Sequence, residues 1–535
     1  MVSEKEKKIL EFLERGILLS PELEGELDSL ALPPTEAPAD LLLFDRESRG
    51  LLDEGVDWRA FDAAKALAEK DGTSSQYARI VEHAKRHELR EKPGVKVLRS
   101  YTKKSKKGSY EDFVSHFNRR FRVLTSILRQ RQELASATAI GRLPQRGERA
   151  RVSVIGMVKK KSTTKSNNTI ITIEDQTGEV VVLIRADRRE VAAIGRDIVL
   201  DEVLGVSGTL GDRILFADEL FLPEVPLTHE LKKGPEEEYV AVIGDPQIGS
   251  KEFLSKDFAK LLAWFNCQLG NEEQRRVAAK VKYLVVAGDL VEGVGVYPGQ
   301  EEDLTIKDIK EQYVAFTRYL QQIPKHIQIL VIPGNHDAGR MAEPQPPIYR
   351  DFAPDLYEME NVTMLSNPCL VNIGAKPGFT GFDMLLYHGY SLIYYSDNVP
   401  SIRERGGQKR AELIMKFLLQ RRHLAPTHGS NLYMPDPEED PLTIDRVPDI
   451  FITGHIHRVA SATYRGVTLL NASTWGDITA DQERRGLEPQ PARLPLINLQ
   501  TRDVKVINFY SGKGKGFLAP GETLEQSAQL NEGAS

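Results

Sequence analysis

Five short apolar runs in the second half of the chain end in the same way, and this repeated layout restricts the fold more than any other feature. Each run leads directly into a turn that carries Asp, Asn or His beside a glycine. Short apolar runs that stop at such turn signals are typical of buried strands. The runs and their endings are 239–243 before Gly244-Asp245, 283–287 before Gly288-Asp289, 327–332 before Pro333-Gly334-Asn335, 384–387 before His388-Gly389, and 450–453 before Gly454-His455.

Polar residues at strand ends indicate a binding site. In open α/β sheets the sheet holds the last residue of a strand rigidly while the loop exposes its side chain. Glycine permits the positive φ and the close approach that a loop folding around an ion requires. Asn and Asp are also ordinary turn residues, so 335–337 taken alone also fits a simple turn. The recurrence of the layout favours a site.

Helical stretches separate the strands at 252–268, 304–322 and 408–422. Alternation of this kind predicts an α/β fold, which we interpret as a two-sheet α/β sandwich over 236–510. The tail, 511–535, has no periodicity, and we expect it to be disordered.

Length and composition limit the other possibilities. At 535 residues the chain is too long for one core and predicts about three domains. With 77 acidic and 71 basic residues the net charge is −6, so any nucleic-acid surface must be local. Cys267 and Cys369 are expected to be reduced thiols rather than a disulfide. Because the chain has neither a signal core nor a run of about 18 apolar residues, we expect a cytoplasmic protein without a membrane span.

The first 135 residues predict helices. Apolar spacing in 4–15 and a helix start at Ser20-Pro21 predict a small helical module over 1–30. A proline-rich segment opens a linker and helical region over 31–135. The Lys- and Arg-rich stretch 86–108 fits either a solvated loop or a DNA contact. Helices are expected at 57–70, 74–89 and 111–133, the last with its Phe residues in the core.

Residues 136–230 change character and predict a β-rich domain. Five short runs separated by turn signals suggest a small Greek-key barrel of the oligonucleotide-binding type. The segment between the first two runs is basic, and in such barrels it can grip a phosphate backbone. It can equally be a solubilising hairpin tip. The candidate DNA-binding residues are Lys159, Lys160, Lys161 and Lys165.

The polar turns also form an ordered set of motifs. Gly244-Asp-Pro-Gln247, Gly288-Asp-Leu-Val-Glu-Gly293, Gly334-Asn-His-Asp337, His388-Gly389 and Gly454-His-Ile-His457 resemble the calcineurin-like metallophosphoesterase superfamily. Three further stretches, 289–300, 421–426 and 471–475, resemble the small subunit of archaeal family D DNA polymerase. That family also places an oligonucleotide-binding barrel before the phosphoesterase domain.

The resemblance implies a site for two divalent metal ions. Oxygen and imidazole ligands without thiolate suit manganese, with magnesium or iron as alternatives. His336 would be the general acid near the leaving oxygen, and Asp337 would orient it. One ion would be held by Asp245, Gln247, Asp289 and His457, and the other by Asp289, Asn335, His388 and His455.

Gln247 departs from the Asp-x-His pattern that is usual for the first motif of the family. An amide oxygen donates less charge than imidazole, so we expect the first ion to bind more weakly or activity to require more manganese. An alternative interpretation is that the metal site is being lost. The eukaryotic B-subunits, which resemble this family, have lost their metal ligands in this way.

The resemblance implies the small subunit of a heteromeric archaeal replicative polymerase. It would remove nucleotides from the 3′ end of single-stranded or mispaired DNA, as a proofreading exonuclease. Its partners would be a large catalytic polymerase subunit, DNA and, through the complex, a sliding clamp. Two alternatives stay open: a catalytically weak or inactive scaffold that stabilises the large subunit, and a phosphatase that uses the same metal site on phosphoproteins or nucleotides.

Overall fold

The computed structural model describes residues 17–19, 42–44, 94–103, 107–144, 149–212, 214–512, 523–526 and 528–529. The chain divides into two compact units, 1–91 and 92–535. In the first unit, β1 (Ile17–Leu19) and β2 (Leu42–Phe44) pair in parallel. The helices expected at 4–15, 57–70 and 74–89 lie outside the described residues. Within the helical module expected over 1–30, only 17–19 are described, and they form a strand.

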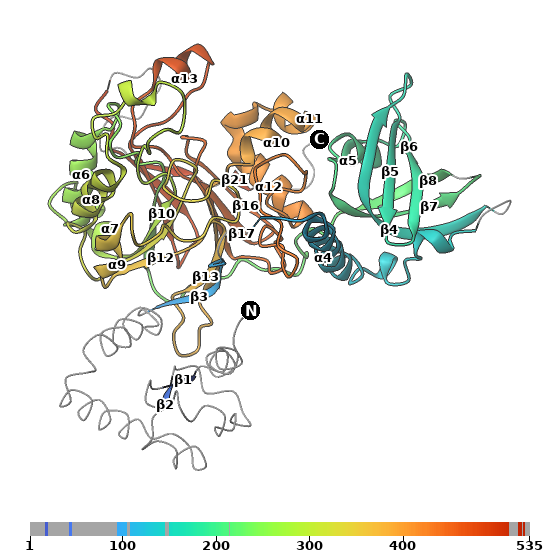
Figure 1. The fold of residues 1–535 in the computed structure, drawn as a ribbon, viewed down its shortest axis with the longest axis horizontal. Coiled ribbons are helices and arrows are strands. Elements are labelled where there is room, and N and C mark those ends of the chain that lie inside the picture. Colours follow the sequence, from blue (N-terminus) through green and yellow to red (C-terminus); the bar gives the residue numbers. More distant parts are fainter. Residues whose placement is uncertain are drawn as a thin grey trace. The chain divides into compact units, whose positions relative to one another are not determined.

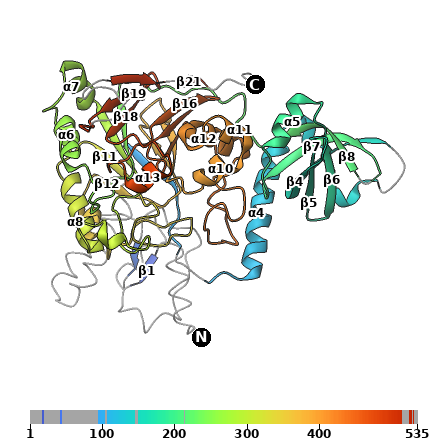
Figure 2. The same cartoon turned by 90° about the horizontal axis from the view of Figure 1, so that it is seen from above.

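Two seven-stranded sheets form the centre of the second unit (Figures 1 and 2). The first has the order β12 (Val362–Met364), β11 (Gln328–Ile332), β10 (Val281–Ala287), β9 (Tyr239–Ile243), β18 (Arg493–Asn498), β19 (Val504–Asn508), β20 (Thr523–Gln526). The second has the order β21 (Ala528–Gln529), β16 (Ala460–Tyr464), β17 (Val467–Asn471), β15 (Ile450–Thr453), β14 (Phe382–Tyr387), β13 (Cys369–Ile373), β3 (Val95–Ser100).

The two sheets pack face to face through fully buried apolar side chains. Because these strands are buried on both faces, they read as continuous apolar runs rather than as an alternating pattern. Val242 and Val285 of the first sheet belong to the same cluster as Met384 and Ile452 of the second. Neighbouring residues such as Leu284 point the other way, into the cluster that includes the helices of the first sheet. The predicted α/β fold is confirmed, and its strands form two stacked sheets.

Helices cover the outer face of each sheet (Figure 1). Those on the first sheet are α6 (Ser255–Phe265), α7 (Glu272–Ala279), α8 (Ile309–Leu320) and α9 (Pro354–Glu358). On the second sheet α12 (Ala411–Arg421) packs against the strands, and α10 (Leu392–Asn398) and α11 (Pro400–Glu404) form a further cluster with α12. Shorter helical turns are α13 (Ala480–Arg484), η4 (Gln132–Leu134), η5 (Ile140–Arg142), η6 (Gln300–Glu302) and η7 (Gly407–Arg410). No helix among the described residues is both long and apolar enough to cross a membrane.

Residues 150–221 form a closed five-stranded barrel. Its strands pair in the order β4 (Ala150–Thr163), β5 (Thr169–Asp175), β6 (Gly178–Ile184), β8 (Ile214–Phe221), β7 (Val203–Leu210), and β7 returns to β4. Helix α5 (Arg189–Arg196) connects β6 to β7. Inward-facing residues such as Val154, Ile171 and Val182 are completely buried and fill the interior.

Two segments fold differently from expectation. Residues 95–100, which we assigned to a linker and helical region, form β3 beside β13. The tail, which we expected to be disordered, supplies β20 beside β19 and β21 beside β16. Such edge strands are held by backbone pairing with a neighbour, and this leaves little trace in the pattern of side chains.

Helix α4 (Tyr110–Leu128) precedes the barrel and ends five residues before the predicted helix end at 133. Its buried residues are His116, Arg120, Leu124 and Leu128, whereas the Phe stripe that we expected in the core is half-buried. Leu124 and Leu128 pack with barrel residues. Arg120 donates from Nε to Asp440 Oδ2 at 2.7 Å and from Nη1 to the Pro426 carbonyl at 2.8 Å. Helix α4 therefore packs with the barrel through Leu124 and Leu128 and binds the segment that carries Asp440 through Arg120.

Replacing Asp440 by Ala tests this buried contact. The Asp440→Ala variant leaves the Arg120 guanidinium buried without its counter-charge, and removing one partner of a buried pair costs about 3–5 kcal/mol. The matched control Asp445→Ala breaks an ion pair with Arg99 in which the Asp445 side chain is 56% exposed. Exposed pairs contribute less than about 1 kcal/mol. Urea unfolding midpoints measure both changes, and equal midpoints would contradict the role assigned to Asp440.

Candidate metal centre

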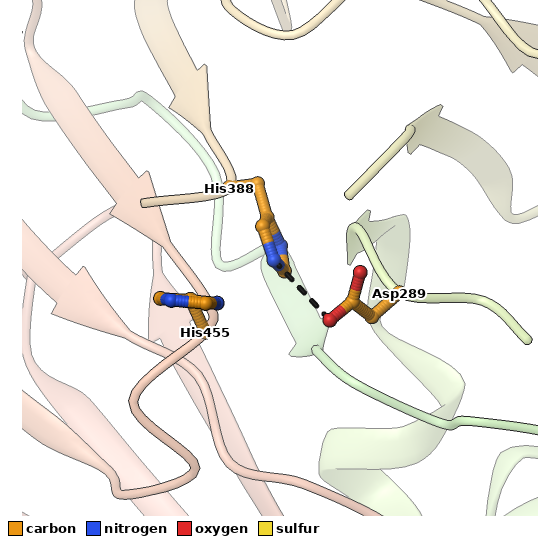
Figure 3. Close-up of side chains that lie close together, drawn as sticks. All are labelled: Asp289, His388 and His455. Atoms are coloured by element: carbon orange, nitrogen blue, oxygen red, sulfur yellow. Dashed lines mark ion pairs between the residues drawn. The ribbon is translucent and has the colours of Figure 1, made fainter. Parts of the chain in front are cut away.

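The strand-end residues of both sheets meet at one place. Strands β9, β10 and β11 run parallel, as do β14 and β15, so their carboxyl ends share an edge. Potential ligand atoms of Asp289, His388 and His455 all lie within 4.8 Å of one another (Figure 3). His388 Nε2 lies 3.4 Å from Asp289 Oδ2 and 3.0 Å from Asn335 Oδ1. These four residues are the predicted ligands of one ion.

The remaining predicted ligands lie beside this group. His457 Nε2 is 3.3 Å from Asp245 Oδ1, and the backbone N–H of His455 donates to Asp245 Oδ2 at 3.0 Å. Gln247 lines the cavity that also contains Asp289 and His457. The structure thus brings all seven predicted ligands together from five chain segments.

The backbone at these positions is strained. Asp245, Gln247, Asp289, His455 and His457 have φ of 50°, 47°, 50°, 68° and 57°, in the left-handed region that non-glycine residues rarely adopt. Each such residue costs about 1–3 kcal/mol and persists only where its surroundings hold it. Strain of this kind is typical of functional loops.

Two motif glycines are required by close packing. A Cβ on Gly334 would lie 2.2 Å from Asp289 Oδ1, and a Cβ on Gly288 would lie 2.4 Å from His388 Nδ1. Any other residue would displace the carboxylate or the imidazole. This explains why these turns carry glycine beside the polar residue.

The charges of the group are tightly coupled. Burial lowers the pKa of His388, but the adjacent Asp289 carboxylate outweighs it and raises the pKa to about 10. Burial raises the pKa of Asp289, but His388 and His336 hold it well below its usual range. Burial, together with His388, lowers the pKa of His455 well below its usual range. His388 Nδ1 donates to the Ala287 carbonyl at 2.8 Å, which directs Nε2 toward the cluster.

Two buried atoms indicate that the group fits a cation. Asp245 Oδ1 and His455 Nε2 are shielded from solvent and have no hydrogen-bond partner. The short contact of Asp245 Oδ1 with His457 therefore lacks hydrogen-bond geometry. Buried polar atoms are almost always satisfied, and a positive ion between these side chains would satisfy both. The donor set of carboxylate, amide and imidazole is that of divalent metal sites.

The structure corrects the role expected for Asp337. Its carboxylate accepts hydrogen bonds from the backbone of Gly334 at 2.8 Å and of Leu290 at 3.2 Å, and from the Tyr313 hydroxyl at 3.0 Å. Asp337 thus holds the loop in place and does not orient His336. Burial, with Asp289 nearby, raises the pKa of Asp337 to about 7.

Glu292 orients His336 instead. His336 Nδ1 lies 2.8 Å from the Glu292 carbonyl and 3.8 Å from the Glu292 carboxylate. The backbone N–H of His336 donates to Asp289 Oδ1 at 2.8 Å. Glu292 stands within the Gly288–Gly293 motif, but nothing in the spacing of that motif predicts this contact.

A chain of buried amides connects the two sheets behind the cluster. Asn367 Oδ1 accepts from the His388 backbone at 2.9 Å, and Asn367 Nδ2 donates to Gln345 Oε1 at 2.7 Å. Gln345 Nε2 donates to the Gly334 carbonyl at 2.9 Å. Sequence reasoning missed Asn367 and Gln345, since isolated amides outside any motif give no signal.

The barrel lysines differ from the expectation of a basic loop. Lys159, Lys160 and Lys161 lie within β4 rather than between strands. Lys159 is paired with Glu174 and Glu179 at 2.8 and 2.9 Å. Lys161 is half-buried and donates to the carbonyls of 196 and 198. Lys160 and Lys165 are exposed.

Comparison with known proteins agrees with the sequence resemblance. A family model for the B-subunit of DNA polymerase alpha/epsilon matches residues 240–461. The DNA polymerase II small subunit of Methanothermobacter thermautotrophicus is 42% identical over 75% of this chain and 79% of its own. That of Archaeoglobus fulgidus is 38% identical over 75% and 78%. That of Methanocaldococcus jannaschii is 40% identical over 73% of this chain and 64% of its own.

Solved structures show only a distant likeness. Vacuolar protein sorting 29 from Cryptosporidium parvum is 19% identical and covers 54% of this chain and 96% of its own, with a TM-score of 0.26. Vps29 from Entamoeba histolytica, in complex with zinc, is 17% identical and covers 54% and 98%, with the same TM-score. TM-scores this low do not support an inference about function. The identity to the Methanothermobacter protein over three quarters of the chain is decisive, and this chain belongs to the family of archaeal DNA polymerase II small subunits.

Proposed function

We propose that this chain is the small subunit of a heteromeric archaeal replicative DNA polymerase and carries its 3′-to-5′ exonuclease. The observation that carries the proposal is the convergence of Asp289, His388 and His455 within 4.8 Å. The cluster borders a cavity of about 800 Å³ that is also lined by His336. A scissile phosphodiester in that cavity would lie against both the cluster and an imidazole.

Two divalent cations, manganese being expected, would occupy the cluster. The unsatisfied atoms of Asp245 and His455 support this occupancy. Such ions neutralise charge on the phosphoryl oxygens and make water a stronger nucleophile. One would be held by Asp245, Gln247, Asp289 and His457, and the other by Asp289, Asn335, His388 and His455.

His336 would protonate the leaving oxygen. Its Nδ1 is engaged by the Glu292 carbonyl, so Nε2 is the atom that remains for the substrate. Burial lowers the pKa of His336, but the carboxylates of Asp289 and Glu292 outweigh burial and raise it. The two carboxylates thus favour the protonated imidazole, which is the form that a general acid requires.

The barrel would hold DNA and help to assemble the polymerase. Its strand order, with a helix between the third and fourth strands, supports the oligonucleotide-binding type. Lys160 and Lys165 are the exposed lysines that would contact phosphates. The large catalytic subunit is the expected partner because relatives carry the name small subunit. A sliding clamp would be reached through that complex.

Gln247 supports an alternative function. Its amide lies in the cavity where the family pattern has imidazole, which favours a weakened site. The alternative is therefore a catalytically weak subunit whose main role is to stabilise the large one.

Removal of His336 tests the exonuclease. The His336→Ala variant should retain the fold and lose about 10²–10⁴-fold in rate, the contribution of general acid catalysis. The exposed His326 provides the matched control His326→Ala, which should behave as wild type. Shortening of a 5′-labelled single-stranded oligonucleotide with manganese present measures the rate. Wild-type activity of His336→Ala would refute the assignment, and cleavage of p-nitrophenyl phosphate but not DNA would favour a phosphatase.

Restoring the family residue tests the weakened site. The Gln247→His variant should reach half-maximal exonuclease activity at a lower manganese concentration, because imidazole donates more charge than an amide oxygen. The control Gln268→His adds an imidazole at an exposed position away from the cluster. A manganese titration of all three proteins measures the midpoints. If wild type and Gln247→His share one midpoint, Gln247 does not weaken the site.

The exposed barrel lysines can be tested by the salt dependence of binding. A plot of log affinity against log salt falls less steeply when a phosphate contact is lost. For single strands the magnitude of the slope decreases by about 0.7 per contact. The double variant Lys160→Gln/Lys165→Gln should therefore bind a single-stranded oligonucleotide more weakly and lower the slope by about 1.4. Lys159→Gln should change neither, because Lys159 is already paired with two glutamates. Fluorescence anisotropy over a range of salt concentrations measures both quantities. If the double variant has the affinity and salt slope of wild type, the segment between β4 and β5 is a solubilising hairpin and does not contact DNA.

A further inference from the structure

A second cavity, of about 400 Å³, also borders the two histidines that follow β15. It shares His455, His457, Gln482 and Leu487 with the larger cavity. The rest of its lining comes from α10 and α11, from the segment around η7, from Ile456 and Arg458 in the loop after β15, and from residues after α13. His336 and Asp289 line the larger cavity and are not part of this second lining. The histidines of the metal cluster therefore border two spaces of different size.

The smaller cavity has the chemistry of a nucleoside site. Ile393, Ile456 and Pro489 provide apolar walls. The polar groups beside them are Gln408 and the charged side chains of Asp397, Arg403, Lys409, Arg458 and Glu488. Small-molecule pockets of about 300–1,000 Å³ combine apolar walls with a few polar groups in this way. At the lower end of that range, the cavity has room for one nucleoside and not for a strand.

The larger cavity suits a strand. It has twice the volume of the smaller cavity. Lys251, Arg484 and Arg485 line it and can pair with phosphates, and five acids line it as well: Glu252, Asp289, Glu292, Asp303 and Asp477. Tyr297, which is 39% exposed, adds an aromatic ring of the kind on which bases stack. The two spaces thus differ in size, and of the two only the larger has a tyrosine in its lining.

We propose that the smaller cavity receives the 3′-terminal nucleoside and that the larger cavity receives the strand that precedes it. This inference rests on the proposed exonuclease function. The position of His336 fixes this direction, because the oxygen that it protonates must lie in the larger cavity. That oxygen is then the O3′ of the penultimate nucleotide.

The reaction balances with water as the only co-reactant. The water oxygen forms a bond to phosphorus and gives up a proton, while the bond from phosphorus to O3′ breaks. The O3′ atom takes a proton from His336 Nε2. The proton released by the water then returns His336 to its protonated form. The terminal nucleotide leaves as a 5′-monophosphate, and the strand keeps a 3′-hydroxyl.

Filling the smaller cavity tests the assignment. Ile393 is 37% exposed, so an Ile393→Trp substitution blocks the cavity without entering the core. Ile214, on the barrel and 36% exposed, gives the matched control Ile214→Trp. Thermal melting of the full-length variants confirms that both fold. The substrates are 5′-labelled oligonucleotides that end normally, lack the terminal base, or lack the penultimate base.

We expect wild type and Ile214→Trp to lose about tenfold in kcat/KM when the terminal base is absent, since stacking of one base contributes about 1–3 kcal/mol. Loss of the penultimate base should matter less. Ile393→Trp should cleave the normal substrate about tenfold more slowly and no longer distinguish it from the one without a terminal base. A larger effect of the penultimate base, or full discrimination by Ile393→Trp, would overturn the assignment.

Calorimetric binding of deoxyadenosine 5′-monophosphate separates failure of this inference from failure of the exonuclease. If no oligonucleotide is shortened, the proposed function fails. The cavity assignment then still stands if wild type and Ile214→Trp bind the nucleotide while Ile393→Trp does not. Absence of binding to wild type, or equal binding by all three proteins, overturns it.

Discussion

The contact between Asp289 and His388 is the point on which the site depends, because it joins the ends of two different sheets. Asp289 follows β10 of the first sheet, and His388 follows β14 of the second. Their distance of 3.4 Å is set by how closely the sheets pack, with side chains such as Val285 and Met384 between them. A change in that apolar layer would move the candidate ligands relative to one another without touching any of them.

The loops around this contact are held from several directions. Asp337 binds the turn after β11 to the start of the loop after β10, and Asn367 with Gln345 connects the turns of the two sheets. These hydrogen bonds offset the cost of left-handed residues at the ligand positions. Glycines at 288 and 334 remove the atoms that would separate the turns. Contacts within the protein therefore fix the geometry of these turns.

The strands and the convergence of the candidate ligands could be predicted because both depend on a local pattern, an apolar run followed at once by a polar turn. Roles that depend on tertiary contacts could not be predicted in this way. Asp337 and Glu292 are both acids near His336 in the motifs, and only the folded loop shows which one contacts the imidazole. The sequence around Lys159 and Lys161 predicted a basic loop. In the structure Lys159 pairs with Glu174 on β5, and Lys161 donates to the Arg196 carbonyl at the end of α5. The helix α4 was predicted, but its buried face includes His116 and Arg120, whose counter-charge is more than 300 positions away.

Strand β3 has a practical consequence for dissecting the protein. It comes from residues before the barrel, yet it completes the outer side of the sheet that carries His388 and His455. A fragment that begins at the barrel would leave the backbone groups of β13 open along a hydrophobic strand. Open edges of this kind recruit strands from other molecules. Fragments that begin at Ala150 would therefore self-associate, and those that begin ahead of Val95 would keep β3 paired with β13.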